Sequence, residues 1–93
     1  MIATFACRAT HQLWLGQKPA ELPPSILQTA LRKLTQLQAA AALHDLRIPP
    51  GNRLEALKGN RTGQHSIRIN AQYRLCFRWV GREAYEIEIT DYH

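Results

Sequence analysis

Hydrophobic residues recur at three- and four-residue steps across residues 25–44, which is the pattern of an amphipathic helix. They form one apolar stripe, made of Ile26, Leu27, Ala30, Leu31, Leu34, Leu37 and Ala41. Lys33 and its polar neighbours Arg32, Gln36 and Gln38 fall largely outside this stripe. Pro24 suits the first turn of such a helix, and the Pro-Pro-Gly run at 49–51 marks a loop. We therefore predict one long helix over residues 25–44.

The residues before this helix predict two shorter elements. Residues 2–6 have the character of a short strand, with Ile2 and Phe5 as its apolar positions. Residues 9–16 favour a short apolar helix that ends near Gly16. The span 17–24 holds three prolines, which cannot continue a helix, so it is predicted to be a connection.

The second half of the chain changes to a period of two. Apolar and polar residues alternate over 66–70, 73–79 and 85–90, which predicts three strands with one apolar face each. The joins at 70–72 and 80–83 are short enough for hairpins, and residues 54–57 are a further candidate strand. We predict a single α+β domain over residues 1–93, with two N-terminal helices packed on one face of a small antiparallel sheet.

Positive charge gathers in one part of the chain. Lys and Arg outnumber Asp and Glu by 12 to 7, and between residues 47 and 82 Glu55 is the only acid. Such a cluster favours a polyanion or an acidic protein as partner, although arginine can also serve only to solubilise a surface. Arg68, Arg74 and Arg78 fall on the polar face of the predicted sheet, where a bound anion would relieve their repulsion. Alternatively, Glu86 and Glu88 neutralise them across the strands.

Several classes of site and location are excluded. Cys7 and Cys76 lie far apart and form neither a zinc motif nor a redox pair, so buried reduced thiols in the cytosol are expected. The His, Cys and Asp residues show no metal spacing. The N-terminus lacks a signal-peptide pattern, and no apolar run approaches the roughly 18 residues of a membrane span. We expect a cytoplasmic protein with no metal, cofactor or membrane partner.

The basic segment carries the side chains needed to cut RNA through its own 2′-hydroxyl. That reaction requires a base for the 2′ proton, cations for the phosphate and an acid for the leaving 5′ oxygen. Glu55 is the candidate base. An ordinary salt bridge from Glu55 to Arg53, Lys58 or Arg74 explains it equally well at this point.

The candidate phosphate ligands lie on a loop and on the strands. Lys58 and Arg61 belong to a stretch with Gly59 and Gly63, whose exposed N–H groups could cradle a phosphate; the glycines could equally serve only as turn residues. This stretch lacks the Gly-Lys-Ser/Thr order of a Walker loop. Arg68 and Arg74 could fork onto phosphate oxygens. Arg68 or Arg78 could instead stack on a base or pair with the acids of the sheet.

The candidate proton donors lie at the chain end. Tyr92 and His93 carry suitable groups, although terminal residues often fray without any role. Asp91 is expected to orient a neighbour or to cap the site. His65 precedes a strand and could be a second acid or a surface for base stacking. His11 and His44 fit surface or packing roles, with His44 at the end of the long helix.

The order and spacing of four segments resemble the HigB branch of the RelE-type toxins. The segments are Gly51 to Arg61, Gly63 to Asn70, Gln72 to Phe77 and the terminal Asp91-Tyr92-His93. The resemblance implies a metal-independent endoribonuclease that cuts messenger RNA in the ribosomal A site and leaves a 2′,3′-cyclic phosphate or its hydrolysed form. Carried over by position, Lys58 and Arg74 match residues that contact the scissile phosphate. Tyr92 and His93, with Asp91, match the functional C-terminus of the family.

One departure from the family pattern concerns the base. Several HigB members have His where this chain has Glu55, whereas the related YoeB toxins place a Glu there as general base. The resemblance also implies a HigA-type helix-turn-helix antitoxin as partner, with operator DNA bound only through the toxin–antitoxin complex. Two alternatives stay open: a non-catalytic basic module that binds nucleic acid or an acidic partner, and an inactive relative kept for antitoxin binding.

Overall fold

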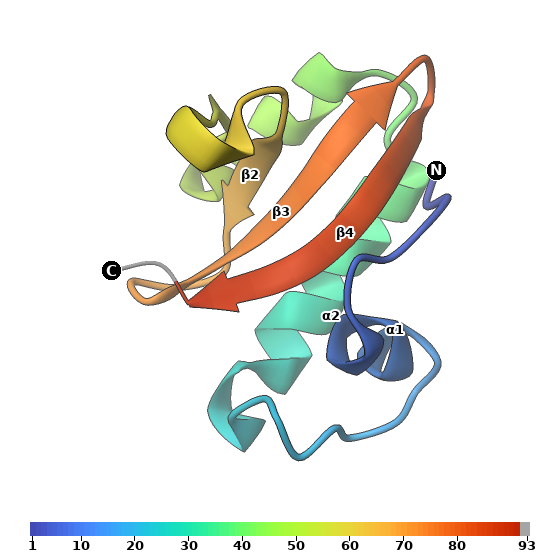
Figure 1. The fold of residues 1–93 in the computed structure, drawn as a ribbon, viewed down its shortest axis with the longest axis vertical. Coiled ribbons are helices and arrows are strands. Elements are labelled where there is room, and N and C mark those ends of the chain that lie inside the picture. The colour runs from blue at the N-terminus through green and yellow to red at the C-terminus, as the bar shows by residue number, and fades with distance from the viewer. Residues whose placement is uncertain (92–93) are drawn as a thin grey trace.

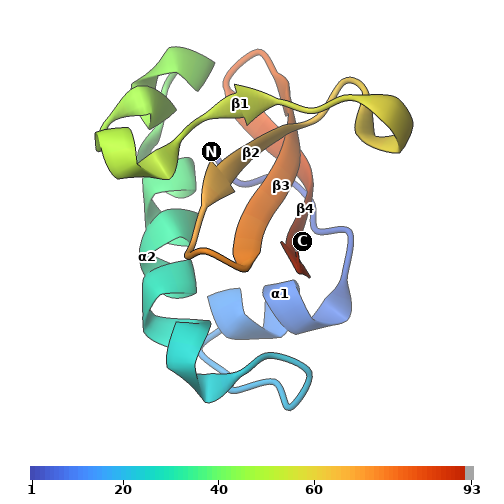
Figure 2. The same ribbon diagram turned by 90° about the vertical axis from the view of Figure 1, so that its left-hand side faces the viewer.

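The computed structural model describes residues 1–91 and has the predicted α+β architecture, with both helices on one side of an antiparallel sheet (Figures 1 and 2). The four strands follow one another in sequence order across the sheet. The helices are α1 (Arg8–Trp14) and α2 (Pro24–Ala39), and the strands are β1 (Glu55–Ala56), β2 (His65–Arg68), β3 (Tyr73–Val80) and β4 (Glu83–Asp91). Three short 3₁₀ helices complete the fold: η1 (Leu43–Arg47), η2 (Pro50–Asn52) and η3 (Gly59–Arg61).

The core forms between the apolar face of the sheet and the stripe of α2. Leu75 and Phe77 of β3 and Ile87 of β4 are fully buried, as are Leu34 and Leu37 of α2. Each side chain of this kind contributes roughly 1.5–3 kcal/mol when it leaves water. The period-two pattern therefore predicted the inner face of β3 correctly, the helical pattern placed Leu34 and Leu37 inward, and the candidate strand at 54–57 is confirmed as β1.

The long helix ends five residues earlier than predicted. It stops at Ala39, and Ala40 has extended backbone with φ −68° and ψ 130°. The Asp45 carboxylate accepts hydrogen bonds from the N–H groups of Ala41 and Ala42, both at 3.0 Å, and these bonds lower the pKa of Asp45. Because an Asp side chain offers the backbone an alternative to helical hydrogen bonds, the alanine run leaves the helix despite its propensity. His44 consequently lies in η1, not at the end of α2.

Lys33 was predicted to lie outside the buried stripe, and the structure corrects this. Its side chain is 8% exposed, and its Nζ donates to Asn52 Oδ1 at 2.6 Å. The Asn52 amide donates in turn to Gln36 Oε1 at 2.8 Å and to the Leu46 carbonyl at 3.1 Å. This buried polar cluster joins α2 to η1 and η2. Burial lowers the pKa of Lys33 below 10.5, with a smaller contribution from the neighbouring Arg32.

The lowered pKa of Lys33 predicts a pH dependence of stability. Between the lowered value and 10.5, the unfolded chain binds more protons at this position than the folded chain. The free energy of unfolding should therefore increase as pH rises through that window, so the folded protein becomes more stable. Chemical denaturation at a series of pH values, compared with Lys33→Met, measures this. A wild-type curve parallel to that of the variant would contradict the prediction.

The last strand contains a bulge that the alternation did not predict. Glu86 has a positive φ of 53°, and the β3–β4 register shifts between Cys76 and Arg78. Beyond the shift, Ala84 takes the buried position opposite Trp79, and Tyr85 lies opposite Arg78. The prediction that Tyr85 continues the apolar face of β4 was therefore wrong. An extra residue in one strand reverses the side of every residue beyond it.

The N-terminal segment pairs with β4 without forming a regular strand. The predicted strand at 2–6 reduces to two isolated parallel bridges, Ile2 with Ala84 and Phe5 with Ile87. Thr10 of α1 is fully buried, and its hydroxyl accepts the Ile89 N–H at 2.9 Å. These contacts hold α1 and the N-terminus against β4, on the side of the sheet away from its arginines.

Candidate active site

The outer face of the sheet brings the predicted acid and arginines together. Strand register aligns Glu55, Ser66, Cys76 and Glu88 in one row across all four strands. The next row aligns Arg68 with Arg74 and Arg74 with Thr90. Directly opposed residues in an antiparallel sheet point to the same face. Glu55 and Arg74 therefore share the face opposite the core.

Arg74 is the most tightly held side chain on this face. Its Nε donates to Ser66 Oγ at 2.7 Å, and its Nη2 donates to the Arg53 carbonyl at 2.7 Å. Its side chain is only 11% exposed, and Ser66 beneath it is fully buried. Two neutral acceptors from separate elements thus set the plane of the guanidinium without cancelling its charge.

Glu55 forms an ion pair with Arg74, with 3.5 Å between Glu55 Oε1 and Arg74 Nε. The Glu55 side chain is 49% exposed, so a ligand can reach the carboxylate. The predicted proximity of these two residues is confirmed. The contact is at the same time the ordinary salt bridge that the sequence left open.

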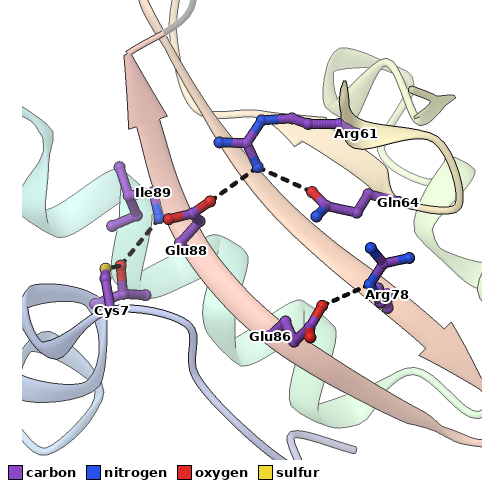
Figure 3. A network of polar contacts seen from close by, with 8 residues as sticks. Cys7, Arg61, Gln64, Arg78, Glu86, Glu88 and Ile89 are labelled. Carbon is purple, nitrogen blue, oxygen red and sulfur yellow. Dashed lines mark hydrogen bonds and ion pairs between the residues drawn. The ribbon is translucent and has the colours of Figure 1, made fainter. Parts of the chain in front are cut away.

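The loop that carries Lys58 and Arg61 folds over the outer face. Arg61 Nη1 pairs with Glu88 Oε1 at 2.8 Å and donates to Gln64 Oε1 at 2.9 Å (Figure 3). The N–H groups of Arg61, Thr62 and Gln64 are bonded to carbonyls of the same loop. These N–H groups are therefore used within the turn, and Lys58 is the exposed cation that the loop contributes.

The acids of β4 neutralise two of the predicted RNA-binding arginines. Arg78 pairs with Glu86 at 2.5 Å, just as Arg61 pairs with Glu88 (Figure 3). The expected alternative of acid neutralisation is thus realised, but partly on a different arginine. Within residues 1–91, Arg68 and Lys58 have no ion-pair partner, and Arg68 lies directly opposite Arg74. Arg68 therefore adds a positive charge beside Arg74 that none of the acids in residues 1–91 neutralises.

Four predicted site residues lie elsewhere or beyond the described chain. His65 pairs in register with Phe77, and their rings lie 6.2 Å apart, so it belongs to the side of β2 away from Arg74. Asp91 pairs in register with Tyr73 and accepts a hydrogen bond from Gln72 Nε2 at 3.0 Å. Side chains alternate along β4, so Asp91 points to the same side of the sheet as Ile89. Thr90, which lies opposite Arg74, points to the other side. Tyr92 and His93 lie outside the described residues.

The residues that hold Arg74 were missing from the sequence prediction. Ser66 could have been found, because the alternation places it on the same face as Arg68. The Arg53 carbonyl could not have been found from the sequence, because every residue has a main-chain carbonyl. Cys76, in the same row, is buried and free, and burial raises the pKa of its thiol, as befits an unreactive cysteine.

Three other features bear on what the described residues can bind. Across residues 1–91, no three His, Cys, Asp or Glu side chains gather in a way that could hold a metal ion. A groove of about 390 Å³ lies between α1 and α2, lined by apolar side chains such as Leu13, Leu27 and Leu31. It shares no residue with the Glu55–Arg74 face. None of the described helices is both long and apolar enough to cross a bilayer.

Gly63 provides a test of how closely the loop lies over the sheet. Its φ is +92°, and a Cβ there would meet Arg78 Nη1 at 2.7 Å. Gly63→Ala should lower the free energy of unfolding by about 1–2 kcal/mol because it strains the backbone and displaces Arg78. Urea denaturation measures the change. Gly51→Ala is the matched control, because a Cβ added at that glycine meets nothing within 4 Å.

Comparison with known proteins agrees with this geometry. The family described as the RelE-like toxin of the type II toxin–antitoxin system HigB matches residues 5–93. Toxin HigB-1 of Vibrio cholerae serotype O1 is 51% identical over 81 residues, which cover 86% of this chain and 85% of that protein. Endoribonuclease HigB of Proteus vulgaris is 39% identical over 41 residues, covering 44% of this chain and 45% of that protein.

A solved structure supports the fold. The YoeB/ParE toxin from Agrobacterium tumefaciens superposes with a TM-score of 0.50 over 96% of both chains, at 16% sequence identity. At that identity the likeness concerns the fold alone. It agrees with the RelE-like arrangement of two helices on one face of an antiparallel sheet.

Proposed function

This chain belongs to the HigB family of RelE-like toxins of type II toxin–antitoxin systems, and from that premise we propose that it is a metal-independent endoribonuclease that cuts messenger RNA in the ribosomal A site. The observation that carries the proposal is the 3.5 Å contact between Glu55 and Arg74 on an exposed, cation-rich face. A relative is named an endoribonuclease, which supports the reaction class.

The proposed reaction is a transesterification within the RNA. The Glu55 carboxylate accepts the proton of the 2′-hydroxyl, and the 2′ oxygen forms a bond to the adjacent phosphorus. The bond from phosphorus to the 5′ oxygen breaks, and Tyr92 or His93 protonates that oxygen. The products are a 2′,3′-cyclic phosphate and a 5′-hydroxyl. Arg74 and Lys58 hold the phosphate as negative charge grows on its oxygens.

The ion pair between Glu55 and Arg74 is compatible with this role. Glu55 is half-exposed, and exposed ion pairs contribute only about 0–1 kcal/mol. Arg74 is held independently by Ser66 and by the Arg53 carbonyl. An incoming phosphate can therefore take the place of Glu55 on Arg74 while the guanidinium stays in position. The displaced carboxylate is then free to accept a proton.

RNA contact is proposed to extend beyond the scissile phosphate. Arg68 has no acidic partner within residues 1–91 and lies beside Arg74, so it is the first candidate for a neighbouring phosphate. Arg61 and Arg78 would exchange Glu88 and Glu86 for phosphate oxygens. Asp91 would orient the C-terminus, whereas His65, which lies on the other side of β2, is not part of this proposed contact. Such contacts make binding sensitive to salt.

The proposed partners follow from the family. A toxin of this class is paired with an antitoxin, which we propose to be a HigA-type helix-turn-helix protein. Operator DNA would be bound only through the toxin–antitoxin complex. The ribosome and its messenger are the proposed targets, which places the activity in the cytoplasm.

A second function has one observation in its favour. Arg61, Arg74 and Arg78 all have acidic partners, as the arginines of a purely structural surface would. On this alternative, the chain is a non-catalytic basic module that binds nucleic acid or its antitoxin.

The deciding experiment uses the purified chain with intact ribosomes that carry a defined messenger. Cleavage within the A-site codon, with cyclic phosphate at the 3′ end of the fragment, supports the proposal. The same messenger without ribosomes tests ribosome dependence. RNA binding without cleavage in both reactions would overturn the enzymatic proposal and favour the binding module.

The C-terminal residues supply a further prediction. Removal of Tyr92 and His93 should lower the cleavage rate by about 10²-fold, because the leaving oxygen loses its proton donor. Tyr92→Phe and His93→Gln, measured separately under the same conditions, show which of the two donates. Circular dichroism confirms that the shortened chain folds. A shortened chain that cuts at full rate would exclude the C-terminal acid.

A further inference from the structure

We propose that residue 53, held in a left-handed backbone conformation by the buried Asn52, positions the Arg74 guanidinium for phosphate binding. This inference rests on the proposed function of Arg74. It assigns a positioning role to a main-chain carbonyl and to a buried amide that lie outside the reacting groups.

The first step is the anchoring of Asn52. Its side chain is fully buried and accepts a hydrogen bond from Lys33 Nζ at 2.6 Å. The amide nitrogen donates to Gln36 Oε1 at 2.8 Å and to the Leu46 carbonyl at 3.1 Å. The partners come from α2 and η1, so Asn52 is fixed from two sides. Buried polar groups with every bond made hold one geometry, because breaking any bond leaves an unpaired group.

The second step is the turn at residue 53. Arg53 follows Asn52 directly and has φ 47° and ψ 54°, the left-handed region. Its N–H donates to the Pro50 carbonyl at 3.1 Å, which closes η2. A residue with a side chain rarely adopts this conformation, because its Cβ then lies too close to the following carbonyl oxygen. The anchored η2 helix therefore keeps Arg53 in a conformation that the residue would not choose alone.

The third step is the bond to Arg74. The Arg53 carbonyl accepts from Arg74 Nη2 at 2.7 Å across 21 residues of sequence. Ser66 Oγ accepts from Nε of the same guanidinium at 2.7 Å. The Ser66 carbonyl also accepts from Nη2, but at the longer distance of 3.4 Å. The Arg53 carbonyl, placed by the left-handed turn, is the short acceptor at that nitrogen and comes from a second element, so it fixes the fork more firmly than Ser66 does alone.

Two substitutions at position 53 isolate this effect. Arg53→Gly and Arg53→Val both remove the same exposed cation, so they change the charge of the surface equally. Glycine adopts a positive φ readily, whereas a β-branched residue strongly disfavours it. The carbonyl should therefore stay on Arg74 in Arg53→Gly and rotate away in Arg53→Val. Should Arg53→Val fail to fold, Arg53→Ala replaces it, since alanine also disfavours this region.

The readouts are the kinetics of cleavage and the side-chain NMR signal of Arg74. At a temperature where both variants are folded, kcat of Arg53→Val should fall at least about tenfold below that of Arg53→Gly, because small misplacements at a reacting group are costly. KM should differ little between them. The Arg74 Nε–H resonance should keep its wild-type position in Arg53→Gly and shift in Arg53→Val.

The possible results separate this inference from the proposed function. Equal kcat values in the two variants, or an unmoved Arg74 resonance in Arg53→Val, would overturn the positioning role. If the wild type cleaves no messenger, or if Arg74→Ala cleaves at full rate, the proposed function fails instead. The NMR comparison tests the positioning of Arg74 in that case too, because it needs no substrate.

Discussion

Arg74→Ala is expected to lower the rate of messenger cleavage by about 10³-fold, because it removes the cation aimed at the phosphate in the transition state. The loss should fall mainly on kcat, since the guanidinium matters most when charge develops on the phosphate oxygens. The variant also leaves the Ser66 hydroxyl and the Arg53 carbonyl without their donor. Its folding must therefore be measured by thermal denaturation alongside single-turnover cleavage on programmed ribosomes.

Two controls make the Arg74 result specific. Arg74→Lys keeps the charge but loses the planar fork, so its rate should lie between those of wild type and Arg74→Ala. Arg82→Ala removes an exposed arginine from the β3–β4 turn, about 20 Å along β3 from Arg74, and should leave the rate unchanged. If Arg82→Ala lowers the rate as much as Arg74→Ala does, general loss of positive charge is responsible and Arg74 has no special role.

The parts of the fold that follow from local pattern were predictable. Alternation placed Leu75 and Phe77 inward, and the three- and four-residue steps placed Leu34 and Leu37 against them. The predictions that were wrong concern residues whose structure depends on a side chain elsewhere in the chain. The end of α2 is decided by the Asp45 side chain, and the burial of Lys33 by Asn52, 19 residues away. Propensity and periodicity describe a segment by itself, so neither contains information about such partners.

The contacts of the candidate site also fall into those that the sequence can predict and those that depend on the folded backbone. The contact between Glu55 and Arg74 was among the possibilities that the sequence offered, because Glu55 is the only acid in its basic segment and a salt bridge to Arg74 was one of its expected pairings. The pairing of Arg78 with Glu86 was less so, because the bulge at Glu86 sets the local register. The Arg53 carbonyl is a main-chain atom whose position depends on a left-handed turn. Side-chain chemistry is visible in a sequence, whereas the direction of a single carbonyl is a property of the folded backbone.

Substitution of Glu55 is the second change for which we expect a large loss of cleavage. Glu55→Gln keeps the size of the side chain but cannot accept the 2′ proton, and we expect a fall of about 10³-fold in the cleavage rate. Because Glu55 is half-exposed and Arg74 has two other acceptors, the fold and the orientation of Arg74 should survive this change. Glu83→Gln removes an exposed acid from the first residue of β4 and should cleave like wild type.

The identity of the base can be read from the pH dependence of Glu55→His. An imidazole acts as a base only when neutral, and its ordinary pKa of about 6.5 is higher than that of a carboxyl group. The acidic limb of the pH–rate profile should therefore move to higher pH in Glu55→His, with activity retained above that limb. Profiles of the two proteins that coincide, or a Glu55→Gln variant that cuts at the wild-type rate, would mean that the proton goes elsewhere. The Glu55–Arg74 contact would then be a structural ion pair and nothing more.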